Sequence, residues 1–73
     1  MSKHKNNELS SALLQAAIAN CVSEIAAAQA TIKLYTSAPA GIGDHPDVIT
    51  EILKAAERGA TAQEKLSFLE DVE

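Results

Sequence analysis

Aromatic residues and cysteines are nearly absent from this 73-residue chain, which has one Tyr, one Phe, one Cys and no Trp. The single cysteine, Cys21, excludes a disulfide within the chain. The two histidines, His4 and His45, lack the further Cys or His ligands that a zinc site needs. A chain this short has a small core and usually needs a disulfide, a metal or a partner subunit for stability. Oligomerisation is the remaining way to stabilise this chain. We expect no metal and no cofactor.

Basic charge is also scarce, since 6 Lys and Arg stand against 10 Asp and Glu, for a net charge of −4. This balance disfavours nucleic acid, whose phosphates need a basic surface. The first residues lack the apolar run of a secretory signal. Residues 10–32 are sparsely charged, but Asn20 and Glu24 would be costly in lipid. We therefore expect a cytoplasmic protein with no nucleic-acid and no membrane partner, a setting that a lone cysteine fits.

Proline and glycine are concentrated in one place, because all of them except Gly59 fall within residues 37–46. Such a cluster breaks a helix and allows the chain to reverse. It divides a single domain, residues 1–73, into a polar arm (1–7), a helix (8–36), a connector (37–45) and a second helix (46–72). The predicted fold class is all-α: an antiparallel two-helix hairpin that assembles into a helical bundle.

Apolar residues in the first predicted helix alternate at spacings of four and three, as in a coiled coil. This seam consists of Leu14, Ile18, Cys21, Ile25, Ala28, Ile32 and Tyr35. We expect it to form either the core of the hairpin or a self-association interface. On such a seam Cys21 is a small apolar side chain rather than a reactive thiol, because no basic residue lies within a turn of it.

The other sides of this helix are apolar as well, and Glu24 is the only formal charge between Ser10 and Ile32. A helix that is apolar nearly all round is usually buried. Alanine, which dominates here, is also the best helix former and tolerates water. Leu13 and Val22 are larger and favour burial, so we predict that they form an outer association face.

The connector ends in a pattern typical of a helix start. Its residues of interest are Pro39, Gly41, Gly43, Asp44, His45, Pro46 and Asp47. Proline suits the first helical position and excludes the preceding residue from the helix, so His45 is the predicted N-cap. Asp44 competes for that role, and Asp47 in the first turn would oppose the positive helix end.

Capping also accounts for the polar residues that might otherwise indicate chemistry. Asp44, His45 and Asp47 have no nucleophile or further ligand near them in the sequence. Gly41 and Gly43 lack the third glycine, the preceding strand and the lysine of a phosphate loop. We therefore expect no catalytic residue and no enzymatic activity.

The second predicted helix alternates apolar and charged residues. Its apolar stripe is Ile49, Ile52, Leu53, Ala56, Ala60, Leu66 and Leu69. Gly59 has two interpretations: it could end a helix before a Thr61-x-x-Glu64 capping box, or it could lie in a continuous helix at a close crossing. The stripe keeps its phase across Gly59, which favours continuity. Folding about the connector would pair positions whose numbers sum to about 81, so that Ala28 faces Leu53.

The stretch P-A-G-I-G-D-H-P-D-V, residues 39–48, followed by a helix ending E-K-L-S-F-L-E, resembles small orphan helical-hairpin proteins of T4-like tailed phages. The phages concerned are notably those infecting marine cyanobacteria, whose proteins share a helix, a GIG(D/E)H-P-D-like connector and a second helix. The alanine-rich first helix and Gly59 are not part of that pattern. The resemblance implies a phage-encoded protein in the host cytoplasm, and it implies no activity.

These observations together predict a non-enzymatic protein–protein interaction module that self-associates through its alanine- and isoleucine-rich first helix. Its further partner would be a host or phage protein, bound by the helical surface. The alternative is a structural or assembly component of a phage particle, such as a virion or chaperone-like subunit. In that case the protein would be located in the virion.

Overall fold

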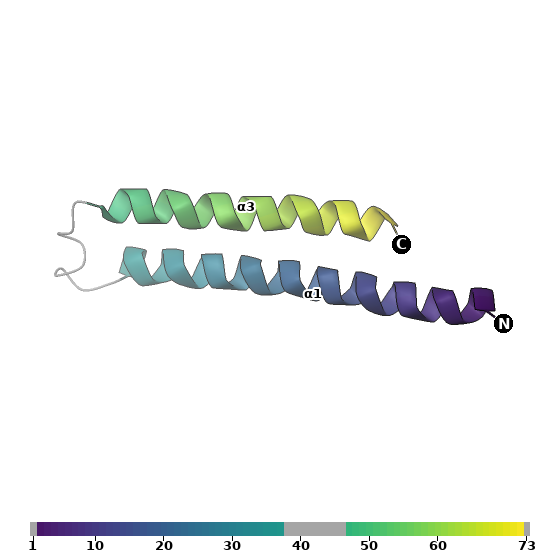
Figure 1. The fold of residues 1–73 in the computed structure, drawn as a ribbon. Helices are drawn as coiled ribbons and strands as arrows, with labels where there is room; N and C mark the ends of the chain where they lie inside the picture. The colour runs from purple at the N-terminus through teal and green to yellow at the C-terminus, as the bar shows by residue number, and fades with distance from the viewer. Residues whose placement is uncertain (1, 38–46, 73) are drawn as a thin grey trace.

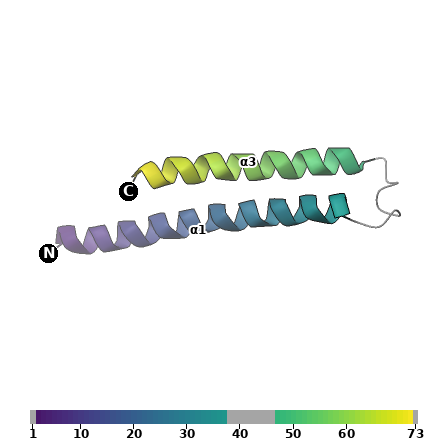
Figure 2. The same ribbon diagram turned by 180° about the vertical axis from the view of Figure 1, so that it is seen from behind.

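Two antiparallel helices make up the part of the protein that the structure, a computed structural model, describes. It describes residues 2–37 and 47–72, with side chains from residue 8 onward. Helix α1 spans Ser2–Ser37 and helix α3 spans Val48–Val72. The two lie side by side and run in opposite directions (Figures 1 and 2). The predicted all-α helical hairpin is therefore confirmed.

The helix boundaries differ from the predicted ones mainly at the N-terminus. Helix α1 begins at Ser2, whereas the sequence predicted a polar arm over residues 1–7 and a helix from residue 8. Polarity alone does not end a helix, and this segment contains no proline or glycine that would. The C-terminal end at Ser37 lies one residue after the predicted end. Helix α3 begins at Val48, two residues after the predicted start, and ends at Val72 as predicted.

The core of the hairpin consists of small side chains. The buried residues are Cys21, Ala28, Ala55 and Ala62. They lie within two stripes with coiled-coil spacing, and the α3 stripe is Val48, Ile52, Ala55, Gly59, Ala62, Leu66 and Leu69. Small residues on both helices allow the two backbones to approach closely, while the larger members of each stripe are only half-buried.

Gly59 lies at a close approach of the two helices and inside a continuous α3. A Cβ atom built on Gly59 would lie 3.0 Å from the Cβ atom of Ala28. The interpretation of Gly59 as a crossing point is confirmed. The predicted register is wrong, because Ala28 meets Gly59 rather than Leu53. In the observed register the numbers of facing residues sum to about 87, which sets Ile25 opposite Ala62.

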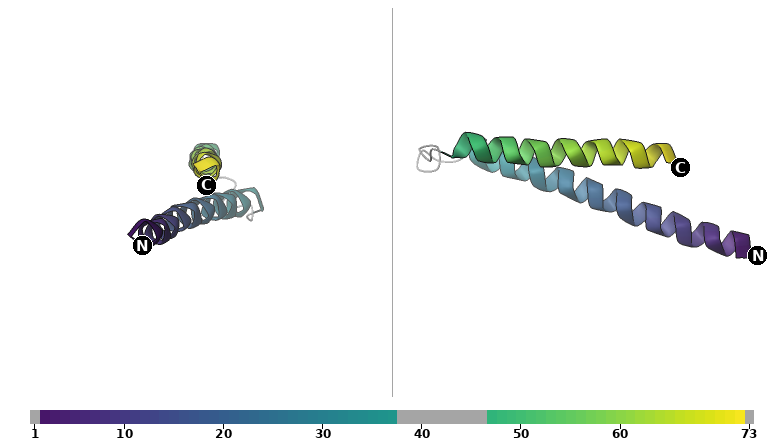
Figure 3. Two further views of the ribbon diagram at one scale, coloured as in Figure 1. Left: turned by 90° about the vertical axis from the view of Figure 1, so that its right-hand side faces the viewer. Right: turned by 45° about the horizontal axis from the view of Figure 1, so that its top comes forward.

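Helix α1 is much longer than its partner, with 36 residues against 25. The N-terminal part of α1 therefore projects beyond the end of α3 (Figure 1). The free ends of the two helices also diverge (Figure 3). The Cα atoms span 61 × 16 × 13 Å, so the hairpin is a flat rod that is two helices wide.

Candidate functional site

The predicted seam of α1 is the side that packs against α3. Its small members Cys21 and Ala28 are buried, and its larger members are half-buried: Leu14, Ile18, Ile25, Ile32 and Tyr35. Among the described side chains, no large one is fully buried. A single partner helix therefore covers only part of each large apolar residue. This incomplete cover is the main feature to be explained by function.

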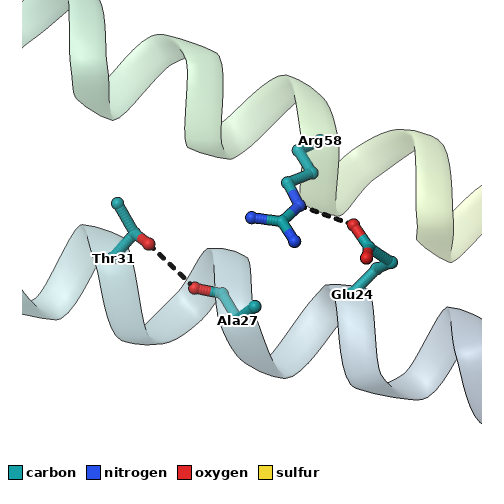
Figure 4. A network of polar contacts seen from close by, with 4 residues as sticks. All are labelled: Glu24, Ala27, Thr31 and Arg58. Atoms are coloured by element: carbon teal, nitrogen blue, oxygen red, sulfur yellow. Dashed lines mark hydrogen bonds and ion pairs between the residues drawn. The ribbon is translucent and has the colours of Figure 1, made fainter.

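One broad face of the hairpin, which we call the charged face, is formed by residues that directly precede members of the α1 seam or of the packed α3 stripe. Glu24 of α1 and Arg58 of α3 are joined there by a hydrogen bond from Arg58 Nε to Glu24 Oε1 at 2.5 Å (Figure 4). Lys54 on the same face lies 3.5 Å from Glu51, one turn away. A shallow groove of about 440 Å³ follows this face past Lys54, Arg58 and Lys65.

The ion pair between the helices changes the titration of both groups. The hydrogen bond from Arg58, followed by the positive charge of Arg58, lowers the pKa of the Glu24 carboxyl group. The same contact raises the pKa of the Arg58 guanidinium. Both side chains are well exposed, at 40% for Glu24 and 50% for Arg58. Exposed pairs contribute little to stability, so the pair mainly fixes how the two helices are aligned.

The opposite broad face, which we call the uncharged face, is formed by residues that directly follow the packed stripe of α3 or the seam of α1, extended at the same spacing to Ser11 and Asn7. Its members are Ala12, Gln15, Ala19, Val22, Ala26 and Gln29 of α1 with Ile49, Leu53, Ala56, Ala60 and Gln63 of α3. All of them are exposed. Among the described residues of this face, the formal charges stand at its ends: Glu8, Lys33 and Glu70. The exposed fraction is 51% for Val22, 63% for Leu53 and 72% for Ile49.

The residues predicted for outer-face association fall on different sides of the hairpin. Val22 belongs to the uncharged face, whereas Leu13 precedes the seam residue Leu14 and belongs to the charged face. Leu13 is 63% exposed. The large apolar residues Phe68 and Val72 near the C-terminal end of α3 are exposed as well. Leu13 and Val22 therefore do not form one patch, although both are exposed as an association surface requires.

At the start of α3, Asp47 occupies the N-cap position, for which the sequence predicted His45. Asp47 directly precedes the helix, and its carbonyl oxygen accepts a hydrogen bond from the backbone N–H of Glu51 at 2.9 Å. That bond is the one that an N-cap residue accepts. The other connector and cap residues predicted from the sequence lie outside the described residues: Pro39, Gly41, Gly43, Asp44, His45 and Pro46.

The described residues assemble no obvious reaction centre. Within residues 8–37 and 47–72, no three His, Cys, Asp or Glu side chains are grouped so as to hold a metal ion. Cys21 is a free thiol buried in the seam between the helices. Acid–base chemistry needs titratable groups gathered in a cavity. The best-defined arrangement of polar groups is the Glu24–Arg58 pair, and its position across the helix interface accounts for it structurally.

Sequence reasoning missed several residues that build the interface. Val48, Ala55 and Ala62 belong to the packed stripe of α3, and Arg58 reaches across it to Glu24. The signal was present, because the stripe from Val48 to Leu69 keeps the strict alternation of four and three residues. The predicted stripe combined two sides of α3: Ile52, Leu66 and Leu69 belong to the packed stripe, whereas Ile49, Leu53, Ala56 and Ala60 are exposed.

No known protein family, curated protein or solved structure matches the chain. One further property bears on location. Residues Glu8–Ser37 of α1 form a segment that is long and apolar enough to cross a membrane by length and composition alone. The core helix of a soluble protein and a signal sequence meet the same two conditions, so this property is weak evidence for a membrane.

Proposed function

We propose that this protein is a non-enzymatic interaction module that works by self-association of its helical hairpin. The observation that carries the proposal is that the described hairpin fully buries no large apolar side chain. Two helices alone rarely give a stable small domain, and oligomerisation is a common way to complete the core. The exposed apolar residues support the same conclusion, since two of the largest, Ile49 and Phe68, are each 72% exposed.

The proposal extends to the setting in which the module acts. Packing between water-soluble helices, rather than insertion into lipid, is supported by Glu24 and Asn20 on α1 and by the ion pair from Glu24 to Arg58. A cytoplasmic location and a further partner among host or phage proteins rest on the resemblance of residues 39–48 to phage proteins. The assembled module would present its charged face to such a partner.

Molar mass by light scattering, measured on the purified chain across a concentration series, tests the self-association directly. We expect a dimer or higher oligomer that loses mass only on strong dilution. A monomer at every concentration, with the helical circular dichroism of a folded hairpin, would overturn the proposal. Sedimentation with lipid vesicles provides a second arm, because a chain that moves with the vesicles would contradict packing in water.

A further inference from the structure

The strongest unexplained feature of the molecule is the combination of a long overhang on α1 with an uncharged face that runs along the same helix. The N-terminal part of α1 projects beyond α3 and has no helix of its own chain beside it (Figure 1). Val22 is exposed on the uncharged face and lies near the middle of α1, which spans Ser2–Ser37. These features are explained together if a second copy lies antiparallel along α1.

We propose that two copies of the hairpin pack through their uncharged faces, with α1 antiparallel to α1 of the second copy and a twofold axis at Val22. This inference rests on the proposed self-association and specifies its geometry. Each residue of α1 would then face the residue whose number completes a sum of 44. Residues 7–37 of one copy overlap the same residues of the other, so residues 7–14 of each copy lie beside residues 30–37 of α1 of its partner.

The order of residues along α1 fits an antiparallel pair of identical helices. On the uncharged face of α1 the order Gln15, Ala19, Val22, Ala26, Gln29 is the same when read from either end, with Val22 at its centre. A twofold axis at Val22 places Gln15 opposite Gln29 of the second copy, on both sides of the axis. An amide both donates and accepts hydrogen bonds, so two glutamines can satisfy each other. Ala19 and Ala26 lie between these positions and allow the helices to approach closely.

Charge and size favour a second copy as the occupant of this face. An interface with twofold symmetry brings each patch against itself, so a patch rich in one charge would repel its copy. The described charges of the uncharged face are few, of both signs and at its ends, as noted for Lys33 and Glu70. The broad side of the hairpin is 16 Å wide between Cα atoms, and the overlap of residues 7–37 is about 45 Å long, so the shared side measures roughly 720 Å². A standard interface uses about 800 Å² from each partner, so the overlap is close to that size.

Cysteine cross-linking tests this geometry, with Cys21→Ala as the background because that thiol would otherwise compete. We expect Val22→Cys to give a disulfide-linked dimer as the main product under mild oxidation, because each Val22 faces its own copy. Ala30→Cys is the matched control, since Ala30 lies on neither the seam nor the uncharged face and should remain unlinked. Gln15→Cys and Gln29→Cys should each remain unlinked alone and should link when the two chains are mixed and reassembled.

A charge test provides a second, independent readout. Gln15→Lys combined with Gln29→Lys should reduce the dimer by tenfold or more through repulsion, whereas Gln15→Glu combined with Gln29→Lys should restore it. Within one chain the two positions are 14 residues apart, or about 21 Å, so the effect arises between copies. A native dimer in which Val22→Cys stays unlinked would overturn this inference and leave the self-association intact. A native monomer would overturn both.

Discussion

Replacing Gly59 with alanine gives the sharpest test of the close approach between the helices. In an exposed helix interior this change stabilises by about 1 kcal/mol, because alanine has the higher helix propensity. At Gly59 the new methyl group would lie 3.0 Å from the Cβ atom of Ala28. Two carbon atoms prefer a separation of about 3.5–4.0 Å, so the helices must move apart locally by roughly 0.5–1 Å.

That displacement has a cost that can be estimated. Inserting a methyl group into packed structure typically costs about 1–3 kcal/mol. The gain from propensity offsets part of this cost, so we expect Gly59→Ala to change the free energy of unfolding by between about zero and a loss of 2 kcal/mol. Ala30→Gly, at an exposed position of α1 on neither the seam nor the uncharged face, is the matched control. It should lose about 1 kcal/mol through propensity alone.

A double-mutant cycle with Ala28→Gly separates packing from propensity. Ala28→Gly removes the methyl group that the new side chain meets, so the double variant should be more stable than the two single changes predict, by about 1–2 kcal/mol. Urea denaturation followed by circular dichroism, at one protein concentration for all variants, supplies the values. A gain of about 1 kcal/mol for Gly59→Ala alone, with no coupling to Ala28→Gly, would refute the close approach.

Three further changes test other parts of the hairpin. Ile25→Asp should abolish the cooperative thermal transition and any association, because it places a carboxylate in the seam opposite Ala62. If both persisted, Ile25 would not lie in the interface. Glu24→Gln should lower the melting temperature at neutral pH; since the folded pKa of Glu24 is lowered, its contribution is complete above the unfolded pKa and is lost as the pH falls through the folded pKa. The difference between Glu24→Gln and the native chain should therefore vanish in acid, and a constant difference down to low pH would contradict the ion pair. Asp47→Ala should cost about 1 kcal/mol through the N-cap and exceed the effect of His45→Ala in the same urea assay, whereas the reverse order would assign the cap to His45.

The sequence predicted the hairpin and the inner side of α1 because each of these features has one unambiguous pattern in the sequence. One seam runs from Leu14 to Tyr35, and one cluster of proline and glycine interrupts the helical pattern. The register did not follow, since α3 carries two stripes with equivalent spacing. The predicted stripe mixed residues of both, with Ile52 and Leu66 from one and Ile49 and Leu53 from the other. The structure packs the stripe with Ala55 and Gly59, because close helix approach depends on small residues rather than large ones.

The start of α1 was mispredicted for a different reason. The polar residues at the N-terminus indicated an arm, but lysine is a good helix former, and no proline or glycine before Gln15 interrupts the backbone. Polarity tells which residues face water, and it does not tell where a helix begins. The same distinction applies to the candidate surface: exposure on each face could be assigned only after the register was known, which is why Leu13 and Val22 were grouped together.

The small size of the buried side chains has a consequence for how long a single copy survives in a cell. Three alanines and one cysteine, led by Ala28 and Cys21, remove little apolar area from water, and hydrophobic stabilisation scales with that area. A lone hairpin is therefore expected to open often and to expose its chain to proteases. A partner that binds only the folded form lowers the open population by mass action. The cellular amount of the protein would then follow the supply of its partner more closely than its own rate of synthesis.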